Sequence, residues 1–153
     1  MFKYVVIILL ISTATKTCNQ ENTEEKNRYE MPEKTTSIEA LNRLHDIWAL
    51  TAIKGEDINK EHFSAGVPTL EIFVVDKRIG GFSGCNNYFA SIEYLDENKI
   101  ALGAIASSKQ YCFEVDEHIF FEHMNKVQRY QLEKIQLFLF EGDELLLTFK
   151  KVD

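Results

Sequence analysis

The sequence predicts a mainly β (α+β) fold, a small antiparallel sheet or β-barrel of about eight strands with one helix. Eight short segments alternate apolar and polar side chains or are rich in β-branched and aromatic residues, which is typical of strands. A single later segment, near residue 120, has apolar residues at helical spacing. Strands and helices do not alternate along the chain, so antiparallel pairing is expected rather than a parallel sheet.

The first five predicted strands lie between residues 47 and 105 and are short. They are Ile47–Ile53, Thr69–Val75, Lys77–Ser83, Tyr88–Leu95 and Lys99–Ile105. Two of the intervals, Gly84–Asn87 and Asp96–Asn98, contain the Gly, Asn and Asp residues that favour turns.

The apolar period then changes, and a helix is predicted over residues 116–127. Asp116 is suited to an N-cap, and Glu117 follows in the first turn, where the helix dipole favours a negative charge. His123 lies on the apolar side of this helix, which predicts a partly buried, hydrogen-bonded core histidine. The last three predicted strands cover residues 128–133, 135–140 and 144–150.

The N-terminus predicts export, with residues 1–17 as a signal peptide. Lys3 precedes a seven-residue apolar run, Val5–Ile11, which is much shorter than the ~20 residues of a membrane-spanning helix. Cys18 is placed like the lipidated first residue of a bacterial lipoprotein. Lys16 departs from the small or aliphatic residues that usually precede such a cysteine. Ordinary secretion with cleavage near Ala14 is therefore the alternative.

Residues 18–43 are polar and charged, and they predict a flexible tether between the anchor and a folded domain at 44–153. A short helical turn is expected within residues 37–44.

The chain has 24 acidic and 17 basic residues, for a net charge of -7. This balance argues against nucleic acid as a partner, and anionic lipid headgroups would repel it. We therefore expect a protein of the cell envelope, anchored at the outer membrane or periplasmic, that contacts the membrane through its N-terminal lipid.

The remaining two cysteines, Cys85 and Cys112, are candidates for a disulfide. An exported chain enters an oxidising compartment, where disulfides form and persist. Two buried thiols are the second possibility. A redox pair is the third, because Cys112 precedes the predicted helix and a helix N-terminus lowers a thiol pKa.

Recognised catalytic patterns are missing from the sequence, so the protein is expected not to be an enzyme and to need no metal or cofactor. The segment Gly81–Cys85 differs from the Gly-x-Ser-x-Gly nucleophile motif at its last position and is not followed by a helix. His118 and His123 are five residues apart, whereas helical zinc sites need two histidines four apart.

An ordered series of short motifs then resembles the META-domain family, to which the heat-shock lipoprotein HslJ belongs. The series runs over residues 46–150 and includes Trp48-x-Leu50, Pro68-x-Leu70, Gly84-Cys85-Asn86-x-Tyr88, Ser108-x-x-x-Cys112 and Glu117-x-x-Phe120. The family motif residues in this chain are Trp48, Gly84, Asn86, Tyr88 and Glu117. Gln110 is a departure, because the family has a buried Met there. A wetter strand end or different packing is expected around it.

The resemblance implies a lipocalin-like barrel that is often tethered as an envelope lipoprotein, in a family whose members are heat-inducible or virulence-associated. We therefore expect a non-enzymatic envelope lipoprotein that acts in binding or stress tolerance, with an unknown protein or small ligand as partner. The alternative is a small-ligand carrier that uses the barrel interior, lined by Trp48 and Phe side chains. We expect, however, that these aromatic side chains fill the interior, which argues against the carrier alternative.

Overall fold

The computed structural model describes residues 39, 41–113 and 115–152. The predicted signal peptide, Cys18 and most of the predicted tether lie outside these residues. Residues 39 and 41–44 are helical, in agreement with the helical turn expected there, and Leu44 is fully buried. Within the described ranges, no helix combines the length and the apolar character needed to cross a membrane.

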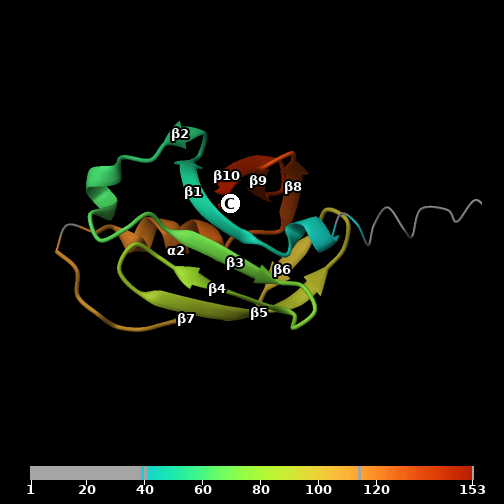
Figure 1. Ribbon diagram of the computed structural model, residues 1–153, viewed down its shortest axis with the longest axis horizontal. Coiled ribbons are helices and arrows are strands. Elements are labelled where there is room, and N and C mark those ends of the chain that lie inside the picture. Colours follow the sequence, from blue (N-terminus) through green and yellow to red (C-terminus); the bar gives the residue numbers. More distant parts are fainter. Residues whose placement is uncertain (1–38, 40, 114, 153) are drawn as a thin grey trace, which may run out of the picture. The chain divides into compact units, whose positions relative to one another are not determined.

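Antiparallel strands form one sheet that curves into a nearly closed barrel (Figure 1). Eight strands follow one another across it: β6 (Ile100–Leu102), β5 (Asn87–Leu95), β4 (Arg78–Phe82), β3 (Thr69–Phe73), β1 (Ile47–Ile53), β10 (Glu144–Lys151), β9 (Gln136–Glu141) and β8 (Arg129–Glu133). The two outermost strands, β6 and β8, meet through a bridge between Lys99 and Arg129. The predicted fold class, an antiparallel barrel of about eight strands, is confirmed.

The seam between β6 and β8 is held by hydrogen bonds. The Ile100 N–H donates to the Gln128 carbonyl at 3.1 Å, and the Tyr130 N–H donates to the Asn98 carbonyl at 2.9 Å. The Tyr130 hydroxyl also donates to the Asp96 carbonyl at 2.7 Å. Burial, reinforced by the charge of Asp96, raises the pKa of Tyr130 to about 12. The hydroxyl therefore stays protonated and remains a donor at neutral pH.

The barrel interior is filled by side chains. Alternate residues of β1 point inward, and Trp48 and Leu50 are 1% and 2% exposed. At the centre, between residues of β3, β4, β6 and β9, the remaining space is about 10 Å³. A single water needs roughly this volume. Among the described residues, the aromatic and aliphatic side chains therefore pack as a core, and this central space is too small for the ligand that the carrier alternative requires.

The helix α2 (Glu117–Met124) covers one open side of the barrel (Figure 1). Its Phe120 is fully buried and packs edge-to-face against Tyr88, with ring centroids 5.5 Å apart. The helix is shorter than the predicted 116–127, because it ends at Met124. Asp116 is the N-cap residue of α2, as predicted, but its side chain makes no capping hydrogen bond. Its backbone (φ -97°, ψ 59°) lacks the extended geometry typical of such a residue.

Three short elements were not expected from the sequence. They are β2 (Glu56–Asp57), the 3₁₀ helix η1 (Lys60–Phe63) and β7 (Ala106–Ser107). The predicted strand 99–105 is shortened to β6, and β7 follows it after a break; the two pair with different parts of the nine-residue strand β5. Between β1 and β3, β2 folds back on the end of β1 and η1 follows it. This excursion forms one wall of the candidate site.

Candidate functional site

A disulfide joins Cys85 to Cys112, with Cα atoms 5.8 Å apart. The sequence left open a disulfide, two buried thiols or a redox pair, and the structure contains the disulfide. The bond ties the turn between β4 and β5 to the segment that leads into α2. Cys85 is buried, whereas Cys112 is partly exposed between the exposed aromatic residues Tyr111 and Phe113.

Asn86 is the centre of a polar cluster beside this disulfide. Its side chain is almost completely buried, at 1% exposed. The amide nitrogen donates to Glu117 Oε1 at 2.8 Å and to the Gln110 carbonyl at 3.1 Å. The amide oxygen accepts from the Gln110 N–H at 2.7 Å and from Ser108 Oγ at 2.8 Å. Both donor hydrogens and both acceptor sites of the amide are thus used.

Ser83 and Glu117 complete the cluster. Ser83 Oγ donates to Glu117 Oε2 at 2.5 Å and accepts from the Asn86 N–H at 3.1 Å. Both carboxylate oxygens of Glu117 therefore accept hydrogen bonds at the first residue of α2, where the helix dipole stabilises a negative charge. We call Ser83, Asn86, Ser108, Gln110 and Glu117, together with the disulfide, the polar clasp. It joins three segments that are distant in the sequence.

The structure divides the five family motif residues between two places. Gly84, Asn86 and Glu117 lie at the polar clasp, whereas Trp48 and Tyr88 lie in the core. Trp48 Nε1 donates to the Leu44 carbonyl at 3.1 Å, and the Tyr88 hydroxyl donates to the Thr69 carbonyl at 2.8 Å. Burial raises the pKa of the Tyr88 phenol far above its ordinary value, with a smaller contribution from Glu71. Both side chains therefore stabilise the fold.

Gln110, the departure from the family pattern, has an exposed side chain, and only its backbone groups take part in the polar clasp. The expectation of a wetter strand end is met. A polar residue is accommodated here because water, not the core, surrounds its side chain.

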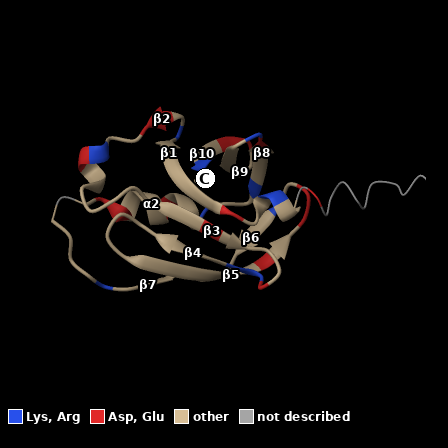
Figure 2. Ribbon diagram, viewed as in Figure 1, with Lys and Arg blue, Asp and Glu red and all other residues tan. Residues whose placement is uncertain are grey.

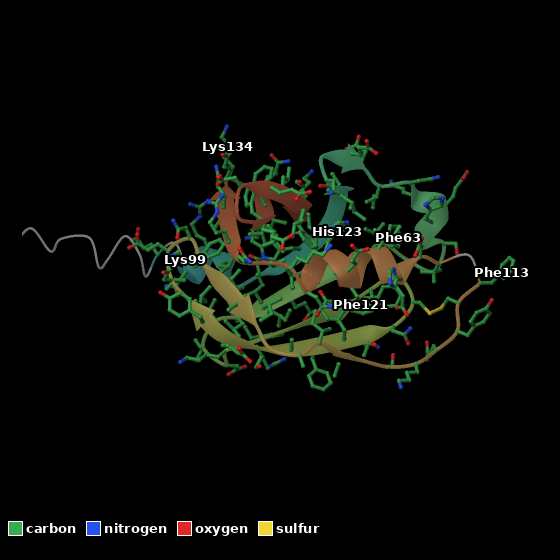
Figure 3. All side chains as sticks on the ribbon, turned by 180° about the vertical axis from the view of Figure 1, so that it is seen from behind. Phe63, Lys99, Phe113, Phe121, His123 and Lys134 are labelled. Carbon is green, nitrogen blue, oxygen red and sulfur yellow. A yellow bond between two sulfur atoms is a disulfide. The ribbon has the colours of Figure 1, made fainter. Side chains whose placement is uncertain are left out.

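A groove of about 460 Å³ lies next to the polar clasp, between β1, β2, η1 and α2. Its apolar lining consists of Ile53, Ile58, Phe63 and Ile119, and its charged lining includes Glu56, Asp57 and Asp116. In Figure 3, His123 and Phe63 lie on the side of α2 that faces β1 and β2, whereas Phe121 lies on the opposite side. Sequence reasoning did not find this groove, because its residues come from separate segments without a common periodicity.

Gly84 connects the polar clasp to the groove. Its φ of +104° is in the region that favours glycine, and a Cβ there would lie 2.6 Å from Phe63 Cδ1. The absence of a side chain lets Phe63 pack against the turn and form part of the groove wall. The turn that Asn86 holds in place is thus also a support for the groove.

His123 forms the inner wall of the groove and is 7% exposed. The predicted burial is confirmed, but the predicted hydrogen bonding is not found at Nδ1, which has no partner among the described residues. Burial is the main cause that lowers the pKa of His123 below 6.5, while Glu122 opposes the shift and Lys126 adds to it. The imidazole is therefore neutral at neutral pH.

This pKa shift predicts a loss of stability on mild acidification. The unfolded chain protonates His123 near pH 6.5, whereas the folded chain does so only at lower pH, so the free energy of unfolding decreases as the pH falls below 6.5. Urea unfolding at pH of about 7.5 and about 5.5 measures the effect. His123→Leu should reduce the pH dependence, whereas the exposed control His118→Gln should keep it. An unchanged dependence in His123→Leu would contradict the assignment.

Comparisons with known proteins give a family match and a fold match. A family model described as the META domain matches residues 39–153. One NMR structure of a protein covers 72% of this chain and 93% of its own, at 18% identity and a TM-score of 0.55. An NMR structure of a protein from Burkholderia xenovorans covers 74% and 87%, at 20% identity and a TM-score of 0.56. At these identities the two structures show a shared fold alone. No curated protein matches the chain significantly.

Proposed function

The chain belongs to the META domain family, and from this membership we propose that it is a non-enzymatic, lipid-anchored protein of the cell envelope that acts by binding. The observation that carries the proposal is the Cys85–Cys112 disulfide, which supports an oxidising compartment outside the cytoplasm. The N-terminal apolar run that precedes Cys18 supports export by the same route.

The proposed anchor is the lipid on Cys18, and residues 18–43 are the proposed tether between it and the folded domain. A single acyl chain binds membranes only marginally, so stable anchoring requires more than one chain, as bacterial lipoproteins usually carry. The net charge of -7 means that electrostatic attraction to anionic lipids does not contribute. Anchoring therefore depends on Cys18.

The binding role is supported by the groove rather than by the barrel interior. The groove has about 460 Å³ of space, within the range of roughly 300–1,000 Å³ that small-molecule sites occupy. The interior space of about 10 Å³ does not support the carrier alternative. The proposed partner is thus a small ligand, or a protein side chain, that enters the groove from outside.

Replacing Cys18 by serine tests the anchor. When the chain is expressed with its N-terminal leader in a bacterium, the wild-type protein should fractionate with membranes and carry a mass increment for acyl chains at Cys18. Cys18→Ser should be released into the soluble fraction. Its unfolding midpoint should be unchanged, because residue 18 lies outside the matched domain.

Mass spectrometry of the mature wild-type protein decides the outcome. An unmodified mass with a free Cys18 thiol, and an N-terminus near residue 15, would contradict lipidation and would indicate ordinary secretion instead. The envelope location would then stand without a lipid anchor.

A further inference from the structure

We propose that the groove between η1 and α2 binds a small amphiphilic amine, a ligand with an apolar body and one cationic group. The inference deepens the proposed binding role by naming the class of ligand, but it does not depend on lipidation. It rests on the apolar wall of the groove, the unbalanced negative charge around it, and the unpartnered nitrogen of His123.

The apolar part of the lining comes from three elements and faces a common space. Ile53 and Ile119 are partly buried on β1 and α2, and Phe63 is 6% exposed at the end of η1. Apolar surface that remains accessible to water gains free energy when an apolar ligand covers it, at about 25 cal/mol per Å². An alkyl or aryl body is the complement of this wall.

The charged part of the lining is predominantly negative. Glu56, Asp57 and Asp116 are exposed and make no ion pair among the described residues. The one lysine in the lining, Lys54, is already paired with Glu144 at 2.6 Å. Figure 2 shows acidic residues along β2 and at the start of α2, the two elements that contribute Glu56, Asp57 and Asp116 to the groove lining. Charge complementarity therefore favours a cation and disfavours a carboxylate or phosphate.

His123 is a polar residue that lines the groove beside its apolar residues. Its side chain is more than nine-tenths buried, and its Nδ1 lacks a hydrogen-bond partner in the described part of the chain. Buried polar groups are nearly always paired in folded proteins, so an unpaired one requires an explanation, of which a bound group is one. A neutral imidazole accepts one hydrogen bond and adds no positive charge, so the wall is compatible with an amine.

Three probes that differ only in their terminal group test the proposal: 4-phenylbutylamine, 4-phenylbutan-1-ol and 4-phenylbutyrate. Each is titrated into the purified chain and followed by two-dimensional NMR. The amine should cause saturable shifts at Ile53, Ile58 and Ile119, with the alcohol weaker and the carboxylate weakest. Shifts that fail to saturate, that lie elsewhere, or that are equal for the three probes would overturn the proposal.

Neutralising the acidic residues of the groove lining measures their electrostatic contribution to amine binding. The variant Glu56→Gln/Asp57→Asn/Asp116→Asn should weaken amine binding about tenfold and leave alcohol binding unchanged, since each exposed carboxylate contributes about 0.2–1 kcal/mol. A matched control makes the same charge change at exposed acidic residues outside the groove lining, with Glu93→Gln, Glu97→Gln and Glu133→Gln. Equal weakening in both variants would show that net charge, not the groove, attracts the amine.

The outcome is separable from that of the anchor experiment. Cys18→Ser should bind 4-phenylbutylamine as the unsubstituted chain does, because residue 18 does not line the groove. If the chain is not lipidated but binds the amine, the groove proposal is supported and the anchor proposal is contradicted. If the chain is lipidated but binds none of the probes, the anchor proposal is supported and the groove proposal is contradicted.

Discussion

Replacing both Cys85 and Cys112 by alanine is expected to lower the free energy of unfolding by about 3.5 kcal/mol. The two residues are 27 apart in the sequence, and closing a loop of this length removes conformational freedom chiefly from the unfolded chain. Denaturant unfolding of the wild-type protein and of the double variant measures the difference. Substituting both residues leaves no unpaired thiol to complicate the comparison.

Removing the disulfide should also lower stability locally, near the two cysteines. The disulfide holds residues 108–113 against the turn between β4 and β5, so amide exchange should accelerate in these two segments before it does in β9 and β10. Cys18→Ser is the control, because it removes a cysteine without changing the disulfide. A stability loss below about 1 kcal/mol in the double alanine variant would contradict the entropic account.

The barrel strands were predictable because one face of each is buried. In β5 the residues Tyr88, Ala90 and Ile92 are buried, while the residues between them are exposed, and this alternation is visible in the sequence. The pairing of β6 with β8 was not predictable, because it depends on curvature of the whole sheet. Likewise, β2 has only two residues and exists because it pairs with the end of β1.

The polar clasp and the groove also differed in how far the sequence could predict them. Gly84 and Asn86 belong to a contiguous motif, so the sequence identified them through the family resemblance. The groove residues share no motif, since the chain brings β2, η1 and α2 together only after folding. His123 illustrates both outcomes, because helical spacing predicted its burial, whereas the absence of a partner for Nδ1 in the described part of the chain depends on tertiary contacts that the sequence does not reveal.

Asn86 should be the most sensitive polar residue of the domain, since the polar clasp is organised around its amide. In Asn86→Ala, the Gln110 N–H loses its acceptor and Glu117 Oε1 loses its donor. An unpaired buried polar group costs about 1–3 kcal/mol, so the variant is expected to lose about 3 kcal/mol of unfolding free energy. Thermal and denaturant unfolding measure the loss.

The neighbouring residue gives a matched control, because Asn87 is also an asparagine but is exposed on β5. Asn87→Ala should change the unfolding free energy by less than about 0.5 kcal/mol. Asn86→Asp separates hydrogen bonding from shape, since it keeps the oxygen that Gln110 needs but sets a second carboxylate against Glu117. Like charges at this distance repel, so Asn86→Asp should be at least as unstable as Asn86→Ala at neutral pH. If Asn86→Asp retained wild-type stability at neutral pH, the donation from Asn86 to Glu117 would not hold the turn to α2, and its support of Phe63 and the groove would need another source.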